Sequence, residues 1–199
     1  MSQRAENVAE KQKKWEFFAL QACILAEMRI FYPVIGLFTN LFYRKADTMK
    51  PEFVKYLQQD SILIVEGETK KKVLDAIVAH ACTRCTMEED QIRDAIWKRE
   101  RMMTTGVGTG LALPHIRING FPSPLVIVAV CRKPAADYKK LDDEPVTLAV
   151  FFAADERDPE AYLRLLGSIS SRLKEDGVIA RIHDAGEDRQ KIFDILAAE

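Results

Sequence analysis

Apolar residues in this chain gather into short continuous runs that are separated by amphipathic stretches. The runs at 61–65, 125–130 and 146–152 have the length of strands, and the last two are rich in β-branched residues. Strands that are apolar at nearly every position are typical of a sheet that is covered on both faces. From about residue 69, strand and helix signals alternate, which predicts an α/β domain.

Capping residues predict where the longer helices begin. A threonine N-cap opens a helix over 69–82, and the sequence Thr86-Met87-Glu88-Glu89 resembles a capping box for a helix that ends near Arg101. An amphipathic helix is expected over 159–174, because a proline occupies its favoured first turn. Two short helices are expected to complete the chain.

An apolar stretch over 15–43 sets the N-terminal part of the chain apart. A plain transmembrane helix needs about 20 apolar residues without a central charge. Glu27 and Arg29 interrupt this stretch, and Pro33 breaks the pattern again. The sequence therefore argues against a plain membrane span.

We divide the chain into an apolar helical N-terminal extension over 1–50 and a domain over 51–199. An amphipathic helix pair in the extension is expected to pack on the domain or to join two chains as a homodimer. Docking of the extension to a membrane surface or to a transporter partner is the alternative.

Charge and cysteine content narrow the classes of partner and compartment. With 29 basic and 30 acidic residues among 199, the chain has no overall field that attracts nucleic acid. The N-terminus lacks the pattern of a secretory signal, and four cysteines fit a reducing cytoplasm. Cys82 and Cys85 have the spacing of half a zinc site, but no second pair completes four ligands, so no metal is expected.

The segment between Arg99 and His115 concentrates residues that handle phosphate. It contains three threonines, three alternating glycines and a proline just before the histidine. Arginine is a permanently charged fork for phosphoryl oxygens, and glycines let backbone amides approach an anion. Because neutral imidazole is a nucleophile near pH 7, the pattern indicates a histidine that accepts a phosphoryl group. The chain lacks the Gly-Lys-Ser/Thr motif of nucleotide hydrolases.

The string Thr-Gly-Val-Gly-Thr-Gly-Leu-Ala-Leu-Pro-His ending at His115, preceded by Arg99 and Glu100, resembles a known active-site signature. It is that of the fructose/mannitol-type enzyme IIA domains of the bacterial phosphoenolpyruvate-dependent phosphotransferase system, and the nitrogen-regulatory branch is most similar. Residues 141–152 resemble the family's Asp-x-x-Pro-Val strand, and 162–173 resemble the helix that follows. The resemblance implies an α/β fold with a mixed β-sheet and helices on both faces.

The resemblance also implies roles for individual residues. His115 is expected to accept the phosphoryl group on Nε2 from HPr or its nitrogen-branch relative, without a cofactor, while Arg99 faces the phosphoryl oxygens. The surrounding phosphate-binding pocket is expected to consist of Thr105, Gly106, Gly108, Gly110 and Tyr162. Tyr162 stands where the family commonly has a second histidine, and a tyrosine cannot carry a positive charge.

Two functions follow from these expectations. In the first, the chain is a phosphotransferase component that passes the phosphoryl group to an enzyme IIB partner for sugar transport, or uses it as a regulatory signal. In the second, it is a non-transferring module of the same fold that controls a transporter, a kinase or a regulator. Both imply a cytoplasmic location, where a partner could bring the chain to a membrane.

Overall fold

The computed structural model describes residues 50–138 and 144–198. The predicted N-terminal extension, apart from its last residue, lies outside the described residues, and so does the start of the Asp-x-x-Pro-Val segment. Within the described ranges, no helix is long and apolar enough to cross a membrane.

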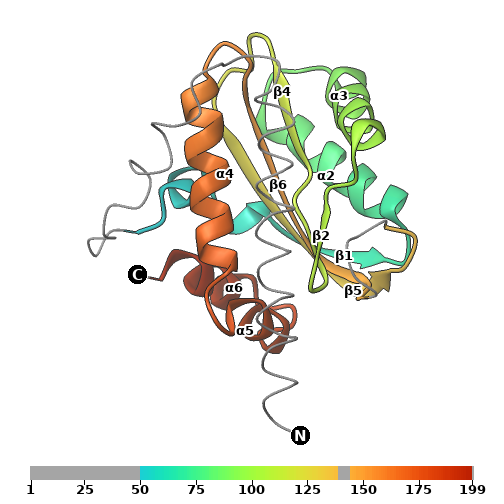
Figure 1. Ribbon diagram of the computed structural model, residues 1–199, viewed down its shortest axis with the longest axis vertical. Helices are drawn as coiled ribbons and strands as arrows, with labels where there is room; N and C mark the ends of the chain where they lie inside the picture. Colours follow the sequence, from blue (N-terminus) through green and yellow to red (C-terminus); the bar gives the residue numbers. More distant parts are fainter. Residues whose placement is uncertain (1–49, 139–143, 199) are drawn as a thin grey trace, which may run out of the picture. The chain divides into compact units, whose positions relative to one another are not determined.

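Six strands form one mixed sheet in the order β1-β5-β6-β3-β2, and β4 also pairs with β6 (Figure 1). Their bounds are β1 Ile62–Gly67, β2 Gly106–Gly108, β3 Leu111–Ala112, β4 His115–Ile118, β5 Leu125–Ala135 and β6 Val146–Asp155. β1 is parallel to β5, and β5 is antiparallel to β6. β3 and β4 are both parallel to β6, whereas β2 is antiparallel to β3. The three predicted apolar runs thus correspond to β1, β5 and β6.

Five α-helices in the described residues cover the sheet. Their bounds are α2 Lys70–Arg84, α3 Glu89–Met102, α4 Pro159–Leu173, α5 Val178–Asp184 and α6 Arg189–Ala197. Helices α2 and α3 lie on one face, while α4 lies on the other with α5 and α6 near its C-terminal end (Figure 1). Two 3-10 helices, η2 (Glu52–Tyr56) and η3 (Gln59–Ser61), precede β1. The expected mixed sheet with helices on both faces is confirmed.

The predicted starts of α2 and α4 are also confirmed. The Thr69 side chain caps α2 by accepting a hydrogen bond from the Lys72 amide, and Asp158 caps α4 by accepting one from the Ala161 amide. Pro159 is the first residue of α4, a position where a missing N–H costs nothing. The chain therefore enters α4 at a defined residue, and the position of Tyr162 one turn later is fixed by this start.

The predicted start of α3 was wrong by two residues. Its N-cap is Glu88, and its capping box pairs Glu88 with Gln91, not Thr86 with Glu89. The observed box has the same spacing, and it also leaves Glu89 and Asp90 in the first turn of the helix. Negative charge there interacts favourably with the helix dipole.

The buried residues of β6 show why its apolar run is continuous. Phe151 and Phe152 follow each other in the strand, so their side chains point to opposite faces of the sheet, and both are fully buried. Phe151 belongs to the core beneath α2 and α3, whereas Phe152 contacts Tyr162 of α4. The functional histidine candidate pairs with Phe152 in the neighbouring strand.

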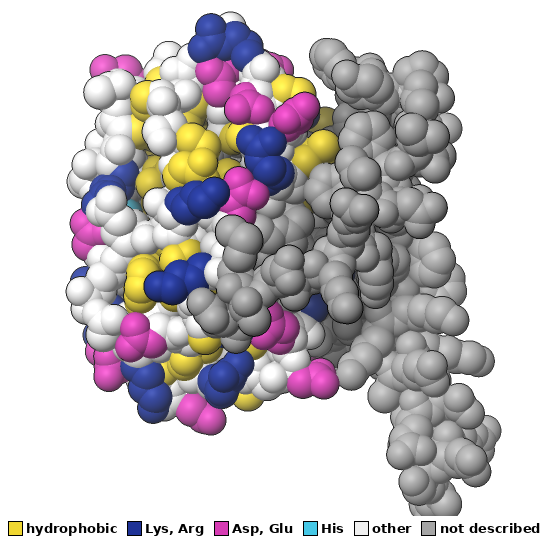
Figure 2. Space-filling model, turned by 90° about the vertical axis from the view of Figure 1, so that its left-hand side faces the viewer, with side chains coloured by type: hydrophobic (Ala, Val, Ile, Leu, Met, Phe, Trp, Pro, Cys, Tyr) yellow, Lys and Arg dark blue, Asp and Glu magenta, His cyan; other side chains and the backbone are white. Residues whose placement is uncertain are grey.

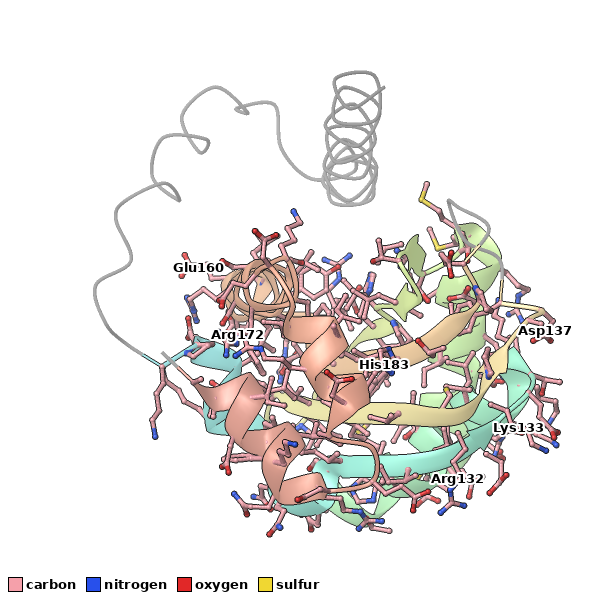
Figure 3. All side chains as sticks on the ribbon, turned by 90° about the horizontal axis from the view of Figure 1, so that it is seen from below. Arg132, Lys133, Asp137, Glu160, Arg172 and His183 are labelled. Carbon is pink, nitrogen blue, oxygen red and sulfur yellow. The ribbon has the colours of Figure 1, made fainter. Side chains whose placement is uncertain are left out.

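Arg172 ties α4 to the C-terminal helix (Figure 3). Its side chain is almost completely buried, and its guanidinium donates to the Ile195 carbonyl of α6 and to the Glu175 carboxylate. A buried charge requires such partners. Charged side chains at the surface can be hydrated instead, and basic and acidic side chains are interspersed on the face that Figure 2 shows.

Replacing Asp158 with alanine tests the cap of α4. Asp158→Ala is expected to lower the free energy of unfolding by about 1 kcal/mol, because the Ala161 amide loses its acceptor. Asp158→Asn is the matched control, since asparagine caps helices as well as aspartate does. Guanidinium chloride unfolding measures both variants, and an equal loss in the two would contradict the cap.

Candidate functional site

His115 lies at an interruption in the sheet. β3 and β4 run along β6 one after the other, and Leu113 and Pro114 separate them. Proline has no N–H to donate to a neighbouring strand, and here the Pro114 carbonyl accepts from the Phe152 amide at 3.2 Å. The Leu113 carbonyl instead lies 2.8 Å from Nδ1 of His115. The break between the strands thus places a backbone acceptor against the imidazole.

Arg99 contacts the other nitrogen of the same imidazole. It lies in the last turn of α3, and its Nε donates to Nε2 of His115 at 2.9 Å. Its Nη1 donates to the Met103 carbonyl, also at 2.9 Å, which holds the guanidinium against the C-terminal end of its own helix. The two residues that the sequence singled out for phosphate chemistry are therefore in direct contact.

These two contacts define the tautomer of His115. A guanidinium only donates hydrogen bonds, so Nε2 must accept from Arg99 with its lone pair. The proton of the neutral ring is then on Nδ1, which donates it to the Leu113 carbonyl. The nitrogen with nucleophilic character is consequently Nε2, and it faces the arginine.

Aromatic rings enclose the imidazole on the α4 side of the sheet. Phe152 stacks on His115 with ring centroids 5.3 Å apart and planes 19° from parallel. The Tyr162 ring is 5.8 Å away and tilted by 57°. The Arg117 guanidinium lies 5.0 Å from the centre of the Tyr162 ring, within cation–π range. His115 is only 7% exposed, so its ring is held in a nearly closed setting.

Thr105 is near this site, but its hydroxyl points away from it. The hydroxyl donates to Oε2 of Glu100 at 2.7 Å and lies 2.7 Å from the hydroxyl of Tyr138. Its carbonyl accepts from the Leu113 amide at 2.8 Å. Thr105 therefore acts on the surroundings of His115 through its backbone.

The three glycines of the predicted pocket lie in a short hairpin formed by β2 and β3. Gly106 pairs with Ala112, while Gly108 and Gly110 belong to a tight hairpin turn around Thr109, where all three residues have positive φ. β6 contacts the hairpin at Leu148 and contacts His115 at Phe152. Four residues of strand span about 13 Å, so the turn lies about that far along β6 from His115. Their positive φ forms the turn.

Sequence reasoning missed a charged network behind Arg99. It consists of Glu100, Thr105, Tyr138 and Lys70, whose ammonium is 2.9 Å from Oε1 of Glu100. A signal was available for one member, because Ile92 and Ile96 are buried and Glu100 follows at the same four-residue spacing in α3. That spacing places the carboxylate on the buried face of the helix.

His80, His183 and Cys82 lie outside this cluster. His80 lies in α2, and His183 in α5 contacts the Thr147 hydroxyl through Nε2 at 3.0 Å (Figure 3). Cys82 is in the last turn of α2, and burial, with Glu89 as a second cause, raises the pKa of its thiol. A thiol with a raised pKa is a poor nucleophile at neutral pH. Among the described residues, no group of three or more His, Cys, Asp or Glu side chains is arranged to hold a metal ion.

A mixed sheet with helices on both faces and a paired arginine and histidine at a strand break define an enzyme IIA-like domain. The chain belongs to the family described as "Phosphoenolpyruvate-dependent sugar phosphotransferase system, EIIA 2", whose family model matches residues 55–199. The match confirms the family resemblance that the signature around His115 indicated. The matched region covers nearly the whole described part of the chain.

Two relatives illustrate the likeness in sequence and in structure. The nitrogen regulatory protein of Pseudomonas aeruginosa is 35% identical over 127 residues, which are 63% of this chain and 81% of that protein. The crystal structure of the nitrogen regulatory protein IIA-Ntr from Neisseria meningitidis superimposes with a TM-score of 0.67 at 19% identity, covering 72% of this chain and 98% of that one. The fold is thus shared with the nitrogen-regulatory branch.

A pair of phenylalanine variants tests the stacking on His115. Phe152→Leu and Phe151→Leu are each expected to lower the free energy of unfolding by about 1–2 kcal/mol, since both side chains are fully buried. Only Phe152→Leu removes the ring beside His115. We therefore expect faster carbethoxylation of His115 by diethyl pyrocarbonate in that variant alone, measured by peptide mass spectrometry. Equal acceleration in both variants would show that lost stability is the cause.

Proposed function

We propose that this chain is a phosphocarrier of the phosphoenolpyruvate-dependent phosphotransferase system, with Nε2 of His115 as the phosphoryl acceptor. The observation that carries the proposal is the pair of contacts to the imidazole. The Leu113 carbonyl accepts from Nδ1 and the Arg99 Nε donates to Nε2. The lone pair of the imidazole is therefore on the nitrogen that the guanidinium contacts. The phosphoryl donor is HPr or its nitrogen-branch relative, as membership of the family suggests.

Transfer then proceeds by exchange of one N–P bond for another. The Nε2 lone pair attacks the phosphorus of the donor's phosphohistidine, and the donor nitrogen leaves with the electron pair of the old bond. The Nδ1 proton remains in its hydrogen bond to the Leu113 carbonyl, so no separate base is needed. Such reactions depend on positioning and on stabilisation of the phosphoryl oxygens more than on covalent chemistry of the protein.

Arg99 takes part by moving its hydrogen bond. In the unphosphorylated protein its Nε–H occupies the Nε2 lone pair, and the attack requires that lone pair. The guanidinium therefore shifts its donors to the phosphoryl oxygens as the group arrives, while the Met103 carbonyl holds Nη1 in place. Charge-assisted hydrogen bonds of this kind are about twice as strong as neutral ones.

A regulatory use of the phosphoryl group is the form of this function that we favour. The relative from Pseudomonas aeruginosa is named a nitrogen regulatory protein, and this chain is similar to it over the segment that contains His115. In this form the phosphorylation state of His115 is the signal, and an enzyme IIB partner is not required.

The second candidate is a non-transferring module on the same fold. It is supported by the enclosure of His115, which is 7% exposed and has the neutral Tyr162 beside it. A chase experiment separates the candidates: labelled phosphoprotein is incubated with purified enzyme IIB domains and with unphosphorylated donor. Loss of label to either acceptor supports the carrier, and complete retention supports the module.

The central prediction concerns the two contacting residues. Incubation with phosphoenolpyruvate, enzyme I and HPr or its nitrogen-branch relative is expected to add one phosphate, and His115→Ala abolishes it. Arg99→Ala is expected to slow labelling by about 100-fold to 1,000-fold, the usual effect of removing one donor to a transition-state oxyanion. Intact mass under neutral to alkaline conditions measures this, because phosphohistidine is acid-labile.

Matched controls keep that result specific. His183→Ala removes a histidine of α5 that contacts Thr147, and Arg101→Ala removes an exposed arginine two residues from Arg99. Both are expected to be labelled at the wild-type rate. Retained labelling in His115→Ala, or none in the wild-type chain with either donor, would refute the carrier function.

Tyr162 offers a further test of the pocket. Tyr162→Phe keeps the ring beside His115 and beneath Arg117, so labelling is expected to stay close to the wild-type rate. Tyr162→Leu removes the ring, and because a cation–π contact is worth about 1 kcal/mol, a loss of roughly fivefold is expected. Initial labelling rates measure both, and a strong defect in Tyr162→Phe would show instead that the hydroxyl is essential.

A further inference from the structure

Glu100 is a buried carboxylate next in sequence to the arginine of the site. Its side chain is 1% exposed, and its oxygens have three partners. The Lys70 ammonium is 2.9 Å away, the Thr105 amide donates to Oε1 at 3.1 Å, and the Thr105 hydroxyl donates to Oε2 at 2.7 Å. A carboxylate this deeply buried is costly unless it is paired and hydrogen-bonded, and Glu100 meets both conditions.

Aromatic residues close this cluster from solvent. The Lys70 ammonium lies 5.6 Å from the Trp97 ring centre and 5.2 Å from that of Tyr138. The Tyr138 hydroxyl lies 2.7 Å from that of Thr105, and burial, with the charge of Glu100 as a second cause, raises the pKa of Tyr138 well above its usual range. A fully satisfied polar network in a low-dielectric interior is rigid, so Thr105 has a fixed position.

An unbroken series of hydrogen bonds leads from this cluster to the imidazole. Glu100 accepts from both the amide and the hydroxyl of Thr105. The Thr105 carbonyl accepts from the Leu113 amide at 2.8 Å, and the Leu113 carbonyl lies 2.8 Å from Nδ1 of His115. Thr105 and Leu113 are each bonded through their amides to the residue before them in the series, and through their carbonyls to the residue after them.

We propose that Glu100 is a positioning residue for His115, which it holds in the Nδ1–H tautomer through Thr105 and Leu113. The identity of the protonated ring nitrogen is set by the hydrogen bond that this nitrogen makes. Glu100 controls that bond because it fixes the segment to which the Leu113 carbonyl belongs. The consequence for phosphoryl transfer rests on the proposed function, whereas the effect on the tautomer does not.

The state of the imidazole in the folded protein separates this role from a merely stabilising one. A stabilising carboxylate affects the melting temperature, as any buried residue does, but leaves the imidazole unchanged in the folded protein. A positioning carboxylate changes the ring of His115 while the chain is still folded. The ring nitrogens, read directly by NMR, therefore distinguish the two roles.

The experiment records ring 15N shifts in histidine-labelled protein at a pH where the imidazoles are neutral. In the wild type, His115 is expected to show protonated Nδ1 and unprotonated Nε2, with His80 and His183 as internal references. Glu100→Gln replaces an acceptor oxygen by a donor, and Glu100→Asp withdraws the carboxylate by one methylene. Both are expected to shift His115 toward a mixture of tautomers. Both should also slow labelling by about 10-fold to 100-fold, the usual effect of losing a supporting contact.

Ile192→Ala is the matched control, because this fully buried residue of α6 lowers stability without contacting the series. It is expected to lower the melting temperature while His115 keeps its tautomer and its labelling rate. If Glu100→Gln or Glu100→Asp is folded and keeps the wild-type His115 spectrum, the proposal is overturned. Thr105→Val supplies the same test if neither Glu100 variant folds, since it removes the hydroxyl contacts to Glu100 and Tyr138 and keeps the Thr105 backbone.

The two proposals fail in different ways. A wild-type chain that no donor labels, but whose His115 tautomer changes in the Glu100 variants, contradicts the phosphocarrier function and supports the positioning role. A chain that is labelled, but whose His115 tautomer does not change in the Glu100 variants, supports the phosphocarrier function and contradicts the positioning role. The NMR measurement needs no phosphoryl donor, so its result is independent of the labelling reaction.

Discussion

The hydrogen bond from Arg99 to Nε2 of His115 is the constraint on which the geometry of the candidate site depends. Because a guanidinium has no acceptor, the bond exists only while the imidazole is neutral and has its lone pair on Nε2. In the proposed phosphocarrier function, the resting protein thus holds its nucleophile in the reactive tautomer, with Nε2 directed at the guanidinium that would bind the phosphoryl oxygens. A histidine exposed to water has no such restriction, and it divides its population between tautomers and protonation states.

The sheet provides this geometry through one local interruption. If β3 continued directly into β4, successive carbonyls would point alternately toward β6 and away from it. None of them would then be directed at a side chain. Leu113 and Pro114 break this alternation: the Pro114 carbonyl bonds to Phe152, and the Leu113 carbonyl is left for Nδ1. Arg99 then reaches the same ring from α3, which covers the opposite face of the sheet from α4. The site therefore needs both helical layers and the edge of the sheet between them.

Much of this arrangement could be predicted from local sequence, and the failures have a common cause. The strands β5 and β6 and the starts of α2 and α4 depend on apolar runs and caps that a short window contains. The turn glycines show the limit: their residue type predicts positive φ, but their distance from His115 is set by where β3 and β4 lie along β6. Glu100 could be placed on the buried face of α3 by its spacing from Ile96, yet its partner Lys70 comes from another helix.

Tyr162 helps to hold the His115 ring in place, and it also limits the access of solvent to that ring. With Phe152 it encloses the imidazole in an apolar setting, where, in the proposed transfer, the attacking lone pair would shed little water before it reacts. The cost of this enclosure is that the positive charge must come from arginine side chains at its margin. Arg99 supplies that charge at Nε2 of His115, and the Arg117 guanidinium lies over the Tyr162 ring. Because arginine stays protonated throughout the physiological pH range, Arg99 and Arg117 keep their charges there, so in the proposed function the phosphoryl group is the variable that a partner reads.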